Sequence, residues 1–286
     1  MSNYKLRNTG PVLVCIAALG LRTVCGQTSP GLQGWFQALM QGPALVAKPS
    51  QDELSALQKR VSAADPDEVH GAIPWMIGAL RLNDGGKEHY AFFGLLAAAL
   101  RSDGPTLLKD RMGDVVSLLT SPGTLAQRGA VFVLGSIQQR QLAPVPGLSQ
   151  ALVSFVKRTD RDLQAQVSAV AFLLSRSEEE MATQDAVEGF LSRDLDADSR
   201  TRVLSAIGRG NANPKPARLI DLVTAALDNP DESVRSTAID MLSLIGPLAV
   251  MRAEPSLRKL AEGTGQPEAI RSAARKALKD AGLRVE

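Results

Sequence analysis

The sequence predicts an all-α fold in which helical hairpins stack as an α-solenoid, a right-handed superhelix. Hydrophobic residues make up 44% of the 286-residue chain and aromatic residues only 4%. Ala, Leu, Gln and Arg are abundant, a composition that favours helices packed through small side chains over a sheet. The same apolar pattern also recurs at intervals of similar length, and helix-start residues precede most copies. Together these observations predict a repeat protein.

The repeating pattern is clearest after Val234, where apolar residues follow at offsets of 4, 5, 8 and 11 and so form one helical stripe. The copies start at Glu88, Ala126, Leu163, Ser199, Val234 and Ile270. Successive starts differ by 38, 37, 36, 35 and 36 residues, a drift expected when insertions fall in loops. The copies after Leu163 and Ile270 are imperfect. We expect each copy to be the first helix of a hairpin.

A second amphipathic segment follows all but the last of these helices. These segments span residues 105–119, 145–157, 178–191, 216–227 and 248–261. Upstream, residues 52–63 and 67–82 form a further hairpin, in which Pro74 should kink the second helix. The sequence therefore predicts about six hairpins and a C-terminal lone helix, forming one solenoid over residues 51–286. Residues 27–50 should supply a short capping helix, 31–40, and a linker.

Helix boundaries carry their own signals. Possible N-terminal caps occur at Asp65-Pro66-Asp67, Ser121-Pro122, Asp160-Arg161-Asp162, Asp196-Ala197-Asp198 and Asn229-Pro230-Asp231-Glu232. Gly246 and Gly282 stand where a helix end needs a left-handed residue. Because such signals recur at hairpin boundaries, we interpret the Asp196 and Asp198 pair as capping rather than as an acid and base.

The N-terminus resembles a secretory signal peptide over residues 1–26. Lys5 and Arg7 precede the apolar stretch 11–21, and Val24-Cys25-Gly26 offers a cleavage site. An uncleaved anchor or a buried helix is the alternative, although a bilayer span needs about 20 residues. Cleavage would leave no stable membrane span and would place the protein in the periplasm or outside a bacterium-like cell.

Cleavage would also change the charge. The chain has 32 Lys and Arg against 30 Asp and Glu, a net charge of +2. Residues 1–26 contain three of the basic residues, no acidic one and both cysteines, so the remainder has a net charge of −1 and no disulfide. This composition gives no support to nucleic acid as a partner.

Residues 229–238 and 267–278 resemble the HEAT-repeat family, including its lyase-type HEAT-like branch. They share the pattern Asp-Pro-x-x-x-Val-Arg-x-x-Ala followed by Ala-Leu. In that family the Asp and Arg of the pattern organise neighbouring repeats. The resemblance therefore implies a structural inter-repeat ladder, with ligand contact as the alternative, at Arg200, Asp231, Arg235 and Arg271. We expect Gln164 to replace the arginine in its repeat.

No catalytic, cofactor or metal site is predicted. His70 and His89 are the only histidines, too few for a zinc site without cysteine partners. The segment 84–87 (Asp-Gly-Gly-Lys) lacks the spacing of a phosphate loop and is interpreted as a turn. The glycine-rich segment 208–216 should be a longer loop within a hairpin. Glu178-Glu179-Glu180 is interpreted as a helix N-terminus rather than as a site for a cation or basic partner.

The aromatic residues Trp35, Trp75, Phe92 and Phe93 could form an exposed partner patch, but core or cap packing is the preferred interpretation. With no catalytic constellation, the predicted function is a non-catalytic protein-interaction scaffold that binds a protein or peptide on its concave surface. Two alternatives stay open: a lyase-related or nucleic-acid-processing enzyme, and a structural repeat protein that associates with itself.

Overall fold

The computed structural model describes residues 31–284 except 44, 46, 47, 83, 139–144 and 146. The predicted signal peptide and its cleavage site lie outside the described residues. Contacts divide the chain into two compact units, residues 1–142 (unit 1) and 143–286 (unit 2). The boundary falls inside the span predicted as one solenoid, and the two units are described separately below.

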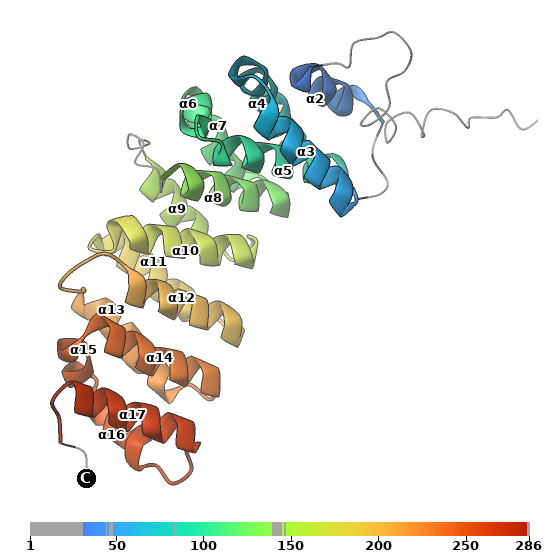
Figure 1. Ribbon diagram of the computed structural model, residues 1–286. Helices are drawn as coiled ribbons and strands as arrows, with labels where there is room; N and C mark the ends of the chain where they lie inside the picture. The colour runs from blue at the N-terminus through green and yellow to red at the C-terminus, as the bar shows by residue number, and fades with distance from the viewer. Residues whose placement is uncertain are drawn as a thin grey trace, which may run out of the picture. The chain divides into compact units, whose positions relative to one another are not determined.

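The regular elements described in unit 1 are all helices (Figure 1). Its helices are α2 (Leu32–Gln41), α3 (Gln51–Ala63), α4 (Pro66–Arg81), α5 (Lys87–Leu100), α6 (Gly104–Leu108), η1 (Lys109–Arg111), α7 (Met112–Ser117), η2 (Leu118–Thr120) and α8 (Thr124–Gln138). The capping helix α2 packs against α4. Both α3 and α8 pack against α5. The main partners of α4 are α2 and α5 rather than α3, with which the sequence had paired it.

Unit 2 repeats the predicted hairpin more regularly. Its helices are α9 (Leu148–Lys157), α10 (Leu163–Ser177), α11 (Met181–Leu191), α12 (Ala197–Arg209), α13 (Ala217–Ala225), η3 (Ala226–Asp228), α14 (Glu232–Ile245), α15 (Pro247–Arg252), α16 (Glu254–Glu262) and α17 (Glu268–Asp280). None of the described residues of either unit lies in a strand. The prediction of an all-α fold built from stacked hairpins is confirmed.

The repeated apolar stripe forms the core, as α14 illustrates. Val234, Ala238, Ile239 and Leu242 are almost fully buried. Burying a Val, Leu or Ile side chain stabilises a fold by about 1.5–3 kcal/mol relative to leaving it exposed. The offsets found in the sequence therefore mark the inward side of α14, whereas in α5 three of the four offset residues, Phe92, Phe93 and Leu96, are only half-buried.

The predicted helix boundaries are confirmed at several points. Asp162, Asp196 and Asp231 are N-caps whose carboxylates accept backbone N–H groups of the first helical turn. Gly246 and Gly282 have φ angles of 119° and 80°, which residues with a Cβ rarely adopt. At Gly282 the turn closes with Leu283 N–H donating to the Leu278 carbonyl over 3.0 Å.

Two of the second segments are divided where the sequence predicts one helix, and proline accounts for one of these divisions. The segment 248–261 divides into α15 and α16, and Pro255 occupies the first turn of α16. Proline suits that position because it has no N–H to leave unpaired. The segment 105–119 is divided further, into α6, η1, α7 and η2, with Pro105 in the first turn of α6. By contrast, α4 continues through Pro74 as one helix.

Among the described helices, none combines the length and the apolar character that crossing a lipid bilayer requires.

Candidate functional site: an arginine-flanked groove in unit 2

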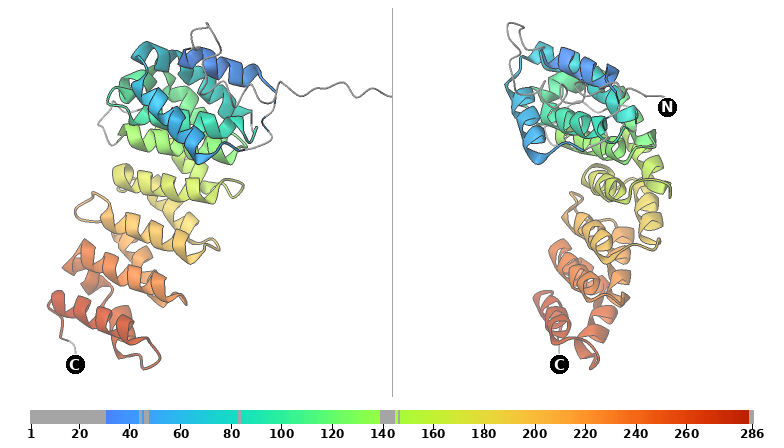
Figure 2. Two further views of the ribbon diagram at one scale, coloured as in Figure 1. Left: turned by 45° about the vertical axis from the view of Figure 1, so that its right-hand side comes forward. Right: turned by 90° about the vertical axis from the view of Figure 1, so that its right-hand side faces the viewer.

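Unit 2 has two layers of helices, visible edge-on in the right view of Figure 2. The first layer contains α10, α12, α14 and α17, which pack side by side in that order. The second layer contains α9, α11, α13, α15 and α16, the return helices of the hairpins. The two layers use their charged residues differently.

The second layer pairs its cations with carboxylates of the neighbouring hairpin. Arg218 of α13 binds Glu188 of α11 and lies 2.5 Å from Asp185. Arg252 of α15 donates to both carboxylate oxygens of Asp221 over 2.5 and 2.8 Å. These hydrogen bonds hold the pKa of Asp221 below its usual range, against a smaller opposing effect of burial, and raise the pKa of Arg252.

A third pair continues the series, since Lys259 of α16 lies 2.8 Å from Asp228 at the end of η3. Each of these three cations is paired with a carboxylate about one repeat earlier in the sequence, so the preceding hairpin neutralises Arg218, Arg252 and Lys259.

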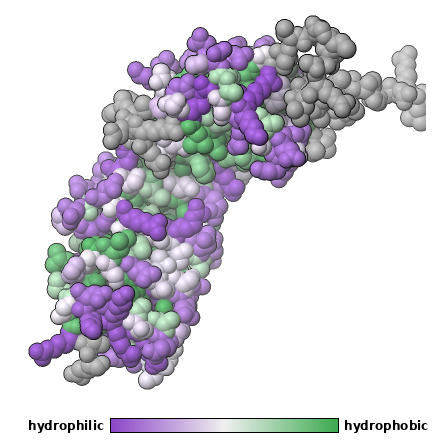
Figure 3. Space-filling view, viewed as in Figure 1, coloured by the Kyte–Doolittle hydropathy of each residue, from purple (hydrophilic) through white to green (hydrophobic). Residues whose placement is uncertain are grey.

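The first layer contains a groove of about 660 Å³ that runs between α10 and α12 and reaches α14. Its lining residues are mostly short: Val167, Ser168, Ala171 and Ser175 from α10, Thr201, Arg202, Ser205, Ala206 and Arg209 from α12, then Gly210, and Thr237 from α14. None of these lining residues is acidic. In Figure 3 pale residues, neither strongly hydrophilic nor strongly hydrophobic, cover part of the face over α12 and α14. We call this feature the Arg202–Arg209 groove.

The two arginines lie seven residues apart on α12, which places them two turns apart on the same face of the helix. Arg202 donates to the side-chain oxygen of Gln164 on α10 and lies 3.9 Å from Asp198, a long and exposed ion pair. Arg209 is exposed, and the structure gives its guanidinium no hydrogen bond or ion pair with the described residues. The groove therefore holds positive charge that the protein itself neutralises only in part.

Three hydroxyl groups of the groove donate their protons to their own helices. Ser168 donates to Gln164 O over 3.0 Å and Ser175 to Phe172 O over 2.7 Å, while Thr201 donates to Asp198 O over 2.9 Å. A hydroxyl oxygen that has donated its only proton can still accept hydrogen bonds. These side chains are consequently acceptors toward anything that enters the groove.

A buried ion pair lies behind one end of the groove. Lys215 Nζ lies 2.8 Å from Glu178 Oε2, and the two side chains are only 3% and 4% exposed. Glu178 also accepts the backbone N–H of Ala212, so it ties the loop between α12 and α13 to the end of α10. We call this arrangement the Glu178–Lys215 clasp. A Cβ on Gly210 would collide with both charged side chains, which explains the glycine there.

The helix N-terminus predicted for the acidic run holds for Glu180 alone. Glu178 is the C-cap residue of α10, and α11 starts at Met181. Glu180 is the N-cap residue of α11, but its side chain makes no capping bond. The prediction of a loop at 208–216 holds over residues 210–216, and it is this loop that supplies the lysine.

Two of the predicted ladder arginines, Arg200 and Arg235, bind backbone carbonyls rather than carboxylates. Arg200 donates to Leu191 O over 2.9 Å and to Arg193 O over 3.1 Å, which joins α12 to the end of α11. Arg235 donates to Asn229 O and Pro230 O, both over 2.8 Å. These carbonyls lie at the end of the preceding helix or just after it, where intrahelical partners are missing.

Asp231 and Arg271 make local contacts. The carboxylate of Asp231 accepts from Ser233 and Val234 of its own helix, and Arg271 pairs with Glu268 one turn earlier. A ladder of alternating Asp and Arg thus stays a prediction, while the contacts between hairpins that the structure shows involve carbonyls and the charge pairs of the second layer.

In α10 the residue equivalent to Arg200 is Gln166, and not Gln164 as predicted from the spacing of the repeats. Gln166 is four residues after the N-cap Asp162, just as Arg200 follows Asp196 and Arg235 follows Asp231. Its buried amide donates to Phe155 O, Val156 O and Arg158 O over 2.8, 3.1 and 2.6 Å. Counting from the capping aspartate would have found it.

The candidates in unit 1 have structural contacts. Lys87 is buried and donates to Gly42 O over 2.7 Å, after the end of α2, so its ammonium group is not directed at a phosphate site. His70 Nδ1 lies 3.1 Å from Leu107 O, and His89 Nδ1 contacts Gly85 O in the preceding turn. Within the described part of the chain, no three His, Cys, Asp or Glu side chains come together as metal ligands would.

The aromatic residues form two clusters in unit 1 instead of one patch. Trp35 packs edge-on against Phe36 and Tyr90, with ring centres 4.8 and 5.5 Å apart. Phe92 packs against Phe93 and against Phe132 of α8. Trp75 is half-buried. Figure 3 shows hydrophobic residues over α5 and α8, where Phe132 is exposed.

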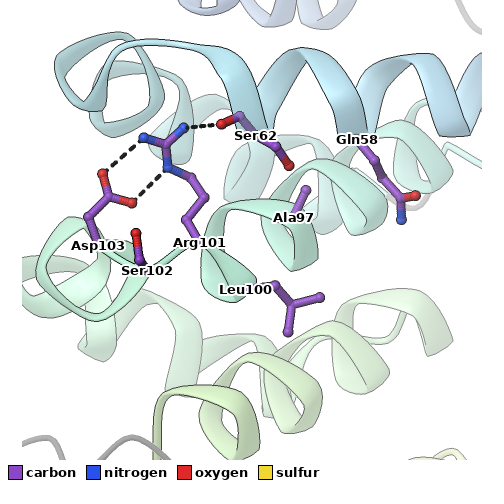
Figure 4. A pocket seen from close by; sticks show the side chains of 7 residues that line it. All are labelled: Gln58, Ser62, Ala97, Leu100, Arg101, Ser102 and Asp103. Carbon is purple, nitrogen blue, oxygen red and sulfur yellow. Dashed lines mark hydrogen bonds and ion pairs between the residues drawn. The ribbon is translucent and has the colours of Figure 1, made fainter.

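Unit 1 also has a pocket, of about 480 Å³, between α3 and the end of α5 (Figure 4). Its cation, Arg101, donates to both oxygens of Asp103 over 2.8 and 2.9 Å. The same guanidinium donates to the carbonyls of Val61, Ser62 and Ala64 at the end of α3. Because these partners hold Arg101, this pocket offers a ligand less than the groove of unit 2 does.

No family model matches the sequence, and no curated protein matches it. Among solved structures, an archaeal HEAT-like repeats protein from Thermococcus onnurineus NA1 is 14% identical with a TM-score of 0.49, over 82% of this chain and 98% of that chain. A designed armadillo repeat protein in complex with the peptide (KR)4 is 19% identical with a TM-score of 0.35, over 88% and 99%. Human deoxyhypusine hydroxylase is 16% identical with a TM-score of 0.37, over 93% and 96%.

These similarities concern the fold alone. The chain is an all-helical protein of stacked hairpins, and its neighbours among solved structures include HEAT-like and armadillo repeat proteins.

Proposed function

We propose that the protein is a non-catalytic scaffold that binds a segment of another protein in the Arg202–Arg209 groove. The observation that carries this proposal is the contrast between the layers of unit 2. In the second layer Arg218, Arg252 and Lys259 are paired with carboxylates of the neighbouring hairpin, whereas the groove combines short side chains, available hydroxyl oxygens and an arginine, Arg209, that makes no hydrogen bond or ion pair with the described residues. Repeat proteins commonly use such extended helical surfaces to bind peptides and proteins.

The lining residues favour binding over catalysis. They include neither a histidine nor a carboxylate, the side chains that most often act as general acids and bases. The shape also favours a chain segment, because the groove extends over three helices of the described structure instead of enclosing a small molecule. As part of the proposal, cleavage near Gly26 would release the scaffold beyond the inner membrane of a bacterium-like cell.

A peptide-display selection tests the proposal. Random peptides would be selected on the immobilised protein, on a Ser205→Trp variant that fills the middle of the groove, and on an Ala225→Trp variant as a matched control on exposed α13. We expect the wild type and the control to enrich the same peptides and Ser205→Trp to lose them. Equal enrichment on all three proteins would move the site elsewhere, and no enrichment on any of them would reject the scaffold function.

A further inference from the structure

We infer that the groove recognises an extended acidic segment in which two carboxylates three residues apart pair with Arg202 and Arg209. This inference rests on the proposed function and adds the chemical class of the partner. Its first support is charge complementarity, because two guanidinium groups flank a groove whose lining residues include no carboxylate. Guanidinium groups bind carboxylates through paired, charge-assisted hydrogen bonds.

The spacing of the arginines sets the spacing of the carboxylates. Seven residues of helix separate Arg202 from Arg209, about 10.5 Å at 1.5 Å per residue. A peptide in the polyproline II conformation repeats every three residues and rises about 3.1 Å per residue, so residues i and i+3 point the same way about 9 Å apart. Flexible arginine side chains can take up the difference, and the motif Glu-x-x-Glu therefore matches the groove.

The hydroxyl groups favour a peptide over another anion. Ser168, Ser175 and Thr201 present acceptors, because each donates its own proton to its helix. An extended peptide has unpaired backbone N–H groups that can donate to these oxygens. The phosphates of a nucleic acid have no such donors. Unit 2 as a whole also has 19 Lys and Arg against 20 Asp and Glu, which gives it no overall attraction for a polyanion.

Fluorescence anisotropy on the full chain tests the inference with four labelled twelve-residue peptides. One has Glu-Ala-Ala-Glu at its centre, the second has the same residues as Ala-Glu-Glu-Ala, and the third and fourth replace both Glu by Gln or by Lys. We expect Glu-Ala-Ala-Glu to bind most tightly. Arg202→Gln and Arg209→Gln should each weaken it about threefold and the double variant about tenfold, since exposed ion pairs contribute modestly.

Arg252→Gln is the matched control, because it removes the same charge from the second layer. It should leave the affinity unchanged, and far-UV circular dichroism would verify that every variant is folded. Equal binding of the Gln peptide, lost in Ser205→Trp, would overturn the acidic inference and keep the groove as a peptide site. Binding of no peptide would reject both. Stronger binding of a dT12 oligonucleotide, lost in the double arginine variant, would overturn the inference in favour of nucleic acid.

Discussion

The two helix layers of unit 2 both contain exposed arginines, but their guanidinium groups have different partners. In the second layer Arg218 and Arg252 bind carboxylates of the neighbouring hairpin. In the first layer Arg209 makes no hydrogen bond or ion pair with the described residues, while Arg202 donates to a glutamine oxygen and lies 3.9 Å from the nearest carboxylate oxygen of Asp198. Residue type alone therefore does not separate a structural arginine from one available to a ligand, whereas a carboxylate contributed by the preceding hairpin does.

The largest effect should come from the clasp that lies behind the groove. Lys215→Met leaves the Glu178 carboxylate buried without its counter-ion, and removing one partner of a buried pair typically costs about 3–5 kcal/mol. Urea unfolding followed by far-UV circular dichroism would measure the loss. A double variant, Glu178→Gln with Lys215→Met, should regain most of it, because no buried charge is left and the amide oxygen can still accept from Ala212. Wild-type stability of the single variant would show that the pair does not form.

The next effect concerns the joint between the two layers. Gln166→Leu removes the donor to three carbonyls around the end of α9. Phe155 O and Val156 O keep the Arg158 N–H and Arg193 as donors, but Arg158 O loses its partner, and leaving a buried polar group unpaired costs about 1–3 kcal/mol. Gln164→Leu is the matched control on the same helix, since the Gln164 side chain contacts Arg202 at the groove rather than these carbonyls. Urea unfolding should show that Gln166→Leu is the less stable variant. The opposite ranking would indicate that Gln164, as predicted from the sequence, is the residue equivalent to Arg200.

That comparison also shows why the fold was more predictable than the site. Apolar offsets and capping aspartates are local signals, and they located the first helices of the hairpins to within a few residues. The clasp joins Glu178 to Lys215 across 37 residues, and the groove collects side chains from three helices. Neither arrangement has a local pattern. The start of the repeat copy in α10 was placed two residues too early, at Leu163. It was set by the apolar matches and not by the distance from the capping Asp162.

A smaller effect compares the two layers directly. Arg218→Gln should lower Tm by about 1–2 °C, because exposed ion pairs stabilise proteins only modestly even when two carboxylates share one arginine. Arg209→Gln should leave Tm unchanged within error, because Arg209 makes no hydrogen bond or ion pair with the described residues that the substitution could remove. Differential scanning calorimetry would measure Tm for both variants and so show which of the two arginines stabilises the fold. A lower Tm for Arg209→Gln than for Arg218→Gln would contradict the division between layers.

The smallest effect lies in acid titration of the second layer. Hydrogen bonds from Arg252 lower the pKa of Asp221, so this pair contributes stability above the unfolded pKa of about 3.9 and loses it as pH falls through the lower folded value. In Arg252→Gln the carboxyl titration of Asp221, followed by carbon-13 NMR, should move to higher pH. The Arg209→Gln variant should leave it in place. A shift in both variants would mean that Asp221 senses the general positive charge of unit 2 instead of one paired arginine, and the contrast between the layers would then be one of degree.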